Sequence, residues 1–181
     1  LLFVGTFEPR KNIRTLLRAY AELRAGNVDI PNLLLVGNPG WLFESTNTLI
    51  DELNLRSTVT FRKRFPPADM PALYSGATAL ILPSHYEGFG FPVLEAMSCG
   101  TATIISDRAS LPEIAGDAAL KCDPNDPESI TDAMSRIIFD DQLRASLEIK
   151  GLQRARKFSW QTSCTQTLEI YRRVLDQTYS A

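Results

Sequence analysis

The chain has 181 residues, of which 44% are hydrophobic, and it carries a formal net charge of -2 at pH 7. This length is enough for one substantial hydrophobic core, so we expect a single domain. The near-neutral charge provides no broad positive field for a polyanion, which argues against nucleic acid as a partner. No apolar run approaches the roughly 20 residues that a membrane-spanning helix requires.

The cysteine and histidine content argues against two further classes of protein. Cys99, Cys122 and Cys164 are widely spaced, form no CxxC pair and are accompanied by a single histidine. Neither a zinc site nor a disulfide framework is indicated, and we expect reduced thiols, as in a cytoplasmic protein. The chain opens on an apolar run without a methionine or signal peptide, so we expect that further sequence precedes it.

Short apolar runs along the chain predict buried parallel strands. They comprise residues 1–4, 33–36, 59–61, 79–82 and 102–105, with a sixth short strand expected at 119–122. Helical patterns follow them at 13–23, 46–53, 69–75 and 92–98, the first of which has Asn12 as its expected N-cap. This alternation predicts an α/β fold, a Rossmann-like doubly wound parallel sheet of about six strands with helices on both faces.

The C-terminal third of the chain is predicted to be helical. The segment 123–127, with two prolines and two aspartates, should break the chain and cap the next helix. Three apolar stripes follow, one from Ile130 to Ile138, a second from Leu143, and a third over 160–175 after Ser159 as N-cap.

Ligands of open parallel sheets bind outside the carboxyl ends of the strands, where two loops carry unusual residues. In the first loop, residues 5–12, Arg10 and Lys11 precede a helix N-terminus, where cations are mildly unfavourable unless an anion is present. A glycine, free helix amides and two cations together favour a phosphate or diphosphate site. Alone, however, the pair is also compatible with an ordinary solvated turn.

The second loop, residues 83–95, is a glycine-rich turn into another helix. Gly88 and Gly90 allow the backbone to approach a ligand closely. Glu87 and Glu95 flank them and supply carboxylates that accept hydrogen bonds from neutral hydroxyls, as a sugar ligand requires. Pro92 suits the first helical turn, and Gly100 is expected to end the helix after Cys99.

The spacing Glu87-x7-Glu95 with the intervening GFGxP resembles the signature loop of retaining glycosyltransferase family 4, also called group 1. That family has the GT-B architecture of two Rossmann-like domains. Further stretches fit it: VGTFEPRKN, LLLVGNPGW, LYSGATALILPSHYEGFGFPVLEAMSCG, SLPEIAGDAAL followed by DP, and FSW. The resemblance covers nearly all of residues 1–181, but only as the C-terminal, donor-binding domain, and implies that the N-terminal acceptor domain is absent from this chain.

The resemblance also implies roles for individual residues. Arg10 and Lys11 would neutralise the donor diphosphate, Glu87 would lie beside the donor sugar as a catalytic residue, and Glu95 would bind the ribose hydroxyls. The rest of the donor site would comprise Gly5, Thr6, Gly88, Phe89, Gly90, Val93 and Leu94. The cation pair replaces a divalent metal in this family, so no cofactor is expected.

The resemblance implies a donor and partners as well. The donor would be a GDP- or UDP-sugar, and GDP-mannose is favoured because EPRKN and GNPGW resemble bacterial mannosyltransferases of surface polysaccharide assembly. The acceptor would be a glycan or a lipid-linked molecule. The protein's own N-terminal domain would be a partner. The isolated chain would bind donor with little turnover. Family members act in the cytoplasm, often as peripheral proteins at the inner face of the membrane.

Two features depart from the family pattern. Lys63 stands where a glycine usually precedes the base-binding turn, within the basic cluster Arg62, Lys63 and Arg64. This leaves the base pocket undefined, and the cluster is expected to be a solvated strand end. His85 is not expected to be catalytic, because the family's catalytic histidine belongs to the other domain.

Alternative functions stay open on the residues alone. Glu87 and Glu95 could serve as the acid and nucleophile of a glycoside hydrolase if their carboxyl groups faced one bond at about 5–9 Å. A sugar-nucleotide epimerase would use the same fold with water in place of the acceptor. A third alternative is a nucleotide-binding module that works alone.

Overall fold

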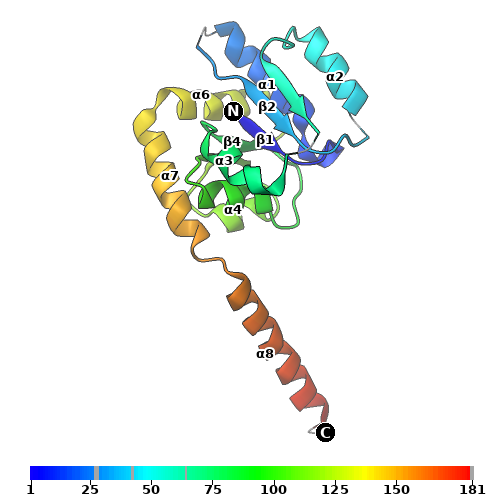
Figure 1. Cartoon of the computed structure of the whole chain (residues 1–181), viewed down its shortest axis with the longest axis vertical. Helices are drawn as coiled ribbons and strands as arrows, with labels where there is room; N and C mark the ends of the chain where they lie inside the picture. Colours follow the sequence, from blue (N-terminus) through cyan, green and yellow to red (C-terminus); the bar gives the residue numbers. More distant parts are fainter. Residues whose placement is uncertain (27–28, 42, 64, 180–181) are drawn as a thin grey trace.

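The computed structural model describes residues 1–26, 29–41, 43–63 and 65–179. Six parallel strands form one sheet in the order β3-β2-β1-β4-β5-β6. Figure 1 labels three of them, β1, β2 and β4. The strands are β1 (Leu2–Val4), β2 (Leu33–Val36), β3 (Val59–Arg62), β4 (Leu80–Leu82), β5 (Thr103–Ser106) and β6 (Leu120–Cys122). All six lie where the apolar runs predict them, and the Rossmann-like parallel sheet is confirmed.

Helices connect the strands and continue to the C-terminal end. They are α1 (Ile13–Gly26), α2 (Phe43–Glu52), α3 (Met70–Ser75), α4 (Phe91–Ser98), α5 (Leu111–Ala115), α6 (Pro127–Phe139), α7 (Asp141–Ala155) and α8 (Trp160–Tyr179). Short 3-10 helices, η1 (Pro9–Lys11) and η2 (Pro67–Asp69), precede α1 and α3. Of these elements, α5, η1 and η2 are absent from the sequence prediction, because each has too few residues to show a helical period.

The ends of α4 and the starts of α6 and α8 agree with the capping residues expected from the sequence. Asp126 accepts a hydrogen bond from the Glu128 amide at the start of α6, and Ser159 accepts one from the Thr162 amide at the start of α8. Pro92 lies in the first turn of α4, and Gly100, in the left-handed conformation with φ of 72°, follows its last turn. These local signals fix where the helices begin and end.

The helices cover both faces of the sheet. On one face α1 packs against α2 and α6, and on the other α4 packs against α3, α5 and α7. The crossover from β3 through α3 to β4 carries the chain from one edge of the sheet back to its centre, so β1 is paired with both β2 and β4. The strand order therefore reverses between β1 and β4, which brings the loops that follow these two strands together.

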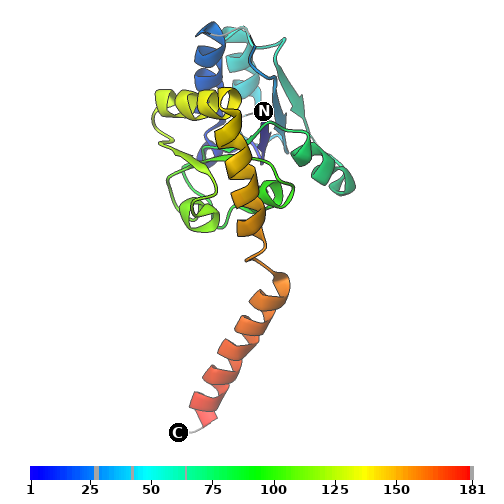
Figure 2. The same ribbon diagram turned by 90° about the vertical axis from the view of Figure 1, so that its left-hand side faces the viewer.

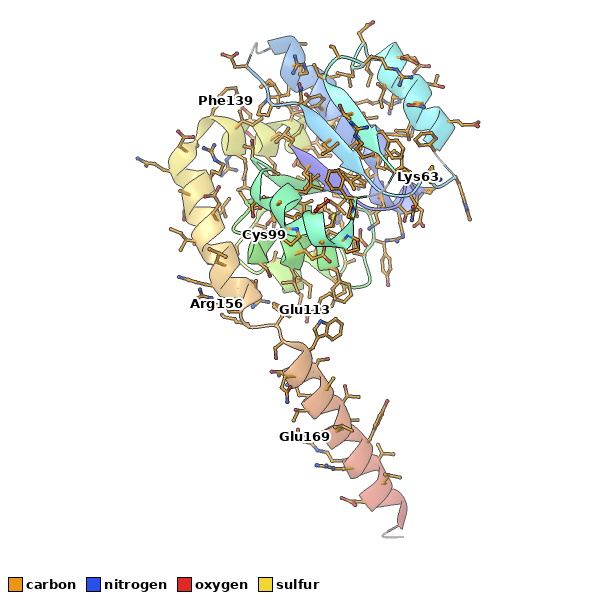
Figure 3. All side chains as sticks on the ribbon, in the orientation of Figure 1. Lys63, Cys99, Glu113, Phe139, Arg156 and Glu169 are labelled. Atoms are coloured by element: carbon orange, nitrogen blue, oxygen red, sulfur yellow. The ribbon has the colours of Figure 1, made fainter. Side chains whose placement is uncertain are left out.

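The last helix, α8, projects away from the rest of the chain in two perpendicular views (Figure 1 and Figure 2). Its predicted apolar stripe is not buried here, since Leu168, Ile170 and Val174 are all more than half exposed. Figure 3 shows the side chains of this helix, Glu169 among them, standing clear of the sheet. None of the described helices combines the length and apolar character needed to cross a membrane.

The three thiols are free, as the sequence suggests. Cys122 is buried at the end of β6, and this burial, with a smaller effect of the Asp107 and Asp123 charges, raises its pKa to about 12. Cys99 is half-buried, Cys164 is exposed, and neither forms a disulfide.

Candidate functional site

The loop after β1 is held against the loop after β2 by backbone hydrogen bonds. The Gly5 amide donates to the Val36 carbonyl at 2.9 Å, and the Phe7 amide donates to the Asn38 carbonyl at 3.1 Å. Gly37 lies so close to this loop that a Cβ atom there would be 1.9 Å from the Gly5 carbonyl oxygen. The loops after β1 and β2 therefore form one unit. The first of them ends in η1, which carries Arg10 and Lys11.

The Glu87 carboxylate joins the two loops predicted to form the site, residues 5–12 and 83–95. Its Oε1 atom lies 2.5 Å from the Lys11 Nζ atom, and its Oε2 atom lies 2.9 Å from a terminal nitrogen of Arg10. The side chains of Glu87 and Lys11 are each only 7% exposed, whereas that of Arg10 is 42% exposed. The structure thus brings together the three residues that the sequence assigns to catalysis and diphosphate binding.

Arg10 also reaches outward from this cluster. Its Nε atom donates to Glu8 at 2.9 Å, and both partners of this outer pair are more than a third exposed. Partial burial disfavours its charge, but the hydrogen bond and charge of Glu87, followed by those of Glu8, raise the pKa of Arg10 above its usual value. Its guanidinium group is therefore a permanent cation at the mouth of the site.

Further hydrogen bonds hold Glu87 and its loop, including those of two serines for which the sequence gives no individual prediction. Ser84 donates a hydrogen bond to Glu87 Oε1 at 2.8 Å, and the hydroxyl of Ser110 donates to the carbonyl oxygens of Glu87 and Phe89, each at 2.9 Å. The His85 amide donates to the Arg10 carbonyl at 2.8 Å. The available signal was a polar residue in the loop that follows a buried strand, since Ser84 lies two residues after the end of β4.

Asn12 precedes α1, as expected, but its side chain does more than flank the helix. Its amide nitrogen donates to the carbonyls of Pro83 at 3.0 Å and Pro124 at 2.6 Å, and it is 7% exposed. Its side-chain oxygen accepts a bond from the Thr15 hydroxyl, in place of a helix amide. Asn12 therefore ties together the segments that follow β1, β4 and β6, and its left-handed φ of 58° suits asparagine.

The glycine-rich turn presents free backbone donors. In the described part of the chain, the amides of Gly88, Phe89 and Gly90 donate no hydrogen bond to another residue. Gly90 has a φ of 104°, and a Cβ atom there would be 2.6 Å from a methyl carbon of Leu111. A Cβ atom at Gly88 would meet nothing within 4 Å. Packing thus requires glycine at 90, whereas 88 faces open space.

The remaining predicted site residues have different environments. Gly5 and Thr6 are half-buried, and a Cβ atom at Gly5 would be 3.2 Å from the Lys11 Cε atom. Val93 is fully buried and its amide donates to the Gly90 carbonyl at 2.9 Å, so this amide is already engaged. Leu94 is half-buried on α4.

A cavity of about 990 Å³ lies beside Glu95, between α3, α4 and the beginning of α8. Apolar and aromatic side chains supply most of its walls, including Met70, Phe89, Leu94, Phe158 and Trp160. Glu95 itself is exposed and accepts a hydrogen bond from the Tyr74 hydroxyl at 2.6 Å. The predicted residues therefore form two neighbouring groups, the Glu87 cluster and the cavity, which the glycine-rich turn connects.

Two residues that departed from the expected pattern lie outside both groups. Lys63 is exposed and does not line the cavity, whose wall at this end begins at Pro67. Arg62 is also exposed, as expected for a solvated strand end, and Arg64 lies outside the described residues. His85 is exposed and contacts the cluster through its backbone. Among the described residues, no group of three or more potential ligands of His, Cys, Asp or Glu type could hold a metal ion.

The family assignment follows from comparison of the sequence with known proteins. Residues 1–154 match the family described as glycosyl transferases group 1. The chain belongs to this family. The match spans both loops of the site, from β1 to α7, so the arrangement around Glu87 belongs to the region that the family shares.

Individual relatives of the family agree with this assignment. The chain is 40% identical over 171 residues to O-antigen chain mannosyltransferase B of Escherichia coli, covering 94% of this chain and 45% of that protein. It is 33% identical over 177 residues to the serotype-specific mannosyltransferase WbdA of Escherichia coli, covering 97% and 22%. The structure matches sucrose-phosphate synthase from Thermosynechococcus elongatus with a TM-score of 0.87 and 31% identity, covering 97% and 45%.

Two consequences follow from these matches. The chain spans less than half the length of each of these relatives. The relatives support a sugar-transferring GT-B domain and give no support to the hydrolase or epimerase alternatives.

Proposed function

We propose that this chain is the donor-binding half of a retaining glycosyltransferase that moves a sugar from a nucleoside diphosphate to a glycan or lipid-linked acceptor. The observation that carries the proposal is the pairing of buried Glu87 with Arg10 and Lys11 at the point where the strand order reverses. Ligands of open α/β sheets bind at this point, and the free amides of the glycine-rich turn lie next to it.

The charges of the cluster suit a diphosphate. At rest, the two cations are balanced by Glu87 and Glu8. The outer pair between Arg10 and Glu8 is exposed, and exposed pairs contribute only about 0–1 kcal/mol, so a diphosphate can replace Glu8 at little cost. Charge on the leaving diphosphate would then be stabilised by Arg10, by Lys11 and by amide donors, without a metal ion.

We further propose GDP-mannose as the donor, because two of the matched relatives are mannosyltransferases. Glu87 would contact the donor sugar and Glu95 the ribose hydroxyls. The acceptor would bind to an N-terminal domain outside this chain, which agrees with the greater length of the relatives. We place the whole protein in the cytoplasm, at the inner face of the membrane when its acceptor is lipid-linked.

Calorimetric titration of the chain with GDP, UDP and ADP tests the donor site. We expect binding of GDP, and we expect Arg10→Ala to weaken it about 10- to 100-fold, because a charged donor to the diphosphate is lost. Arg56→Ala is the matched control, since Arg56 is also an ion-paired arginine but lies by α2.

Several outcomes of the titration would count against the site. These are absence of binding for all three nucleotides, equal binding by the wild type and Arg10→Ala, and a loss of affinity in Arg56→Ala as large as that in Arg10→Ala. Repeating the titration with EDTA checks metal independence, and an unchanged dissociation constant is the expected result.

A comparison of the chain with the longer protein that contains an N-terminal half tests where catalysis resides. We expect the longer protein to transfer mannose and the chain alone to form no detectable product, because groups from both halves would be needed around the acceptor. The one-bond NMR coupling between the anomeric carbon and its proton should show that the product keeps the donor's configuration. Turnover by the chain alone, or an inverted product, would contradict this proposal.

A further inference from the structure

Tyr74 and Glu95 form a pair at the edge of the cavity that the sequence does not predict. Tyr74 lies on α3, with its residue 1% exposed, and its hydroxyl donates to Glu95 Oε2 at 2.6 Å. In the described part of the chain, no other hydrogen bond or ion pair reaches the Glu95 carboxylate. One carboxylate oxygen is therefore held by the protein, and Oε1 remains available to a ligand.

Tyr74 is also held through its backbone carbonyl, at the other end of the residue from its hydroxyl. The hydroxyl of Thr101, a residue only 3% exposed, donates to the Tyr74 carbonyl at 2.7 Å. The Thr101 amide in turn donates to the Ala96 carbonyl on α4, at 3.0 Å. The buried ring cannot change its direction without disturbing this packing, so the hydroxyl remains at one place above α4.

Glu95, in contrast, is a long and exposed side chain. Such side chains populate several rotamers, and fixing one of them costs up to about 2 kcal/mol of conformational entropy. A partner that fixes Glu95 before the ligand arrives removes part of this cost from binding. Burial, followed by the hydrogen bond and charge of Glu95, raises the pKa of Tyr74 above its usual value, so its hydroxyl stays a proton donor.

We propose that Tyr74 is a positioning residue, which holds Oε2 of Glu95 so that Oε1 meets a ribose hydroxyl of the nucleotide. This inference rests on the proposed role of Glu95 in donor binding. Tyr74 acts through Glu95 and needs no contact of its own with the ligand. Discrimination between ribose and deoxyribose should therefore depend on a residue outside the Glu87-x7-Glu95 stretch.

The test is a calorimetric titration of wild type and Tyr74→Phe with GDP and UDP and with their 2′-deoxy and 3′-deoxy forms. We expect Tyr74→Phe to weaken ribonucleotide binding by about 3- to 10-fold and to leave binding of the deoxy form that lacks the bonded hydroxyl nearly unchanged. Phenylalanine keeps the buried ring, and water can reach the exposed Glu95 carboxylate. In a Glu95→Ala background, Tyr74→Phe should have no further effect.

Tyr20→Phe is the matched control. Tyr20 is likewise fully buried, on α1, and does not line this cavity. Its hydroxyl donates to the carbonyl of Pro31, shortly before β2, at 3.0 Å. It should change binding of neither nucleotide form. An equal loss for ribo and deoxy forms in Tyr74→Phe, no loss at all, or additive effects with Glu95→Ala would overturn the positioning role. Failure of wild type to bind either nucleotide would overturn the proposed function and this inference with it.

Discussion

Replacing Glu87 with alanine is expected to lower the free energy of unfolding by about 3–5 kcal/mol, because it leaves the buried Lys11 ammonium without its partner. Lys11 is 7% exposed, and its nearest charge is the Glu87 carboxylate at 2.5 Å. Ser84 would lose its hydrogen-bond acceptor as well. Denaturant unfolding followed by circular dichroism measures the change.

A double variant distinguishes two causes of destabilisation in Glu87→Ala, namely the unpaired Lys11 charge and a general loss of packing. In Lys11→Met/Glu87→Met both charges are removed, and we expect stability within about 1 kcal/mol of wild type, since buried pairs contribute little net stability over hydrophobic residues of similar size. Asp51→Ala is the control for an ion pair at the surface, because Asp51 and Arg56 are both more than half exposed, and its unfolding midpoint should barely move. A double variant as unstable as Glu87→Ala would refute the explanation.

Replacing Gly37 with alanine is expected to destabilise the chain by about 2–4 kcal/mol and to weaken GDP binding at the same time. The new Cβ atom would be 1.9 Å from the Gly5 carbonyl oxygen and 2.6 Å from its carbon, and backbone atoms cannot move aside as a flexible side chain can. The displaced loop is the one that leads to Arg10 and Lys11. Thermal unfolding and calorimetric titration of the same samples measure both effects.

Gly26→Ala is the matched control for this change. Gly26 ends α1, and a Cβ atom there would meet nothing within 4 Å. Alanine in a helix is about 0.5–1 kcal/mol more favourable than glycine, so this variant should be as stable as wild type or more so. If Gly37→Ala were as stable as Gly26→Ala and bound GDP equally well, the close contact between the loops after β1 and β2 would not be essential to the site.

Much of the fold could be predicted from short-range patterns. The runs at residues 33–36 and 119–122 predict β2 and β6 to within one residue, because strands buried on both faces are apolar at successive positions. Ser159 and Asp126 mark helix starts through their own side chains. In contrast, the apolar stripe that predicted α8 stays exposed in the structure. The spacing of apolar residues predicts a helix, but it does not show which element packs against that helix.

The candidate site was only partly predictable. Arg10, Lys11 and Glu87 could be proposed from residue type and from their places at strand ends. Tyr74 and Ser110 could not, because each acts through a partner at least 21 residues away in the sequence. Nothing in the local pattern around Tyr74 distinguishes its hydroxyl from that of Tyr20, which bonds a backbone carbonyl elsewhere.

The sequence by itself determined the parallel α/β class, the starts of α4, α6 and α8 and the family, because each depends on residues that are close together in the chain. Only the tertiary structure decided that β1 and β4 are neighbours, that Glu87 pairs with the two cations, and that Glu95 is held by Tyr74. The crossover through α3 brings residues 10 and 87 together, and this proximity depends on how the whole sheet is assembled.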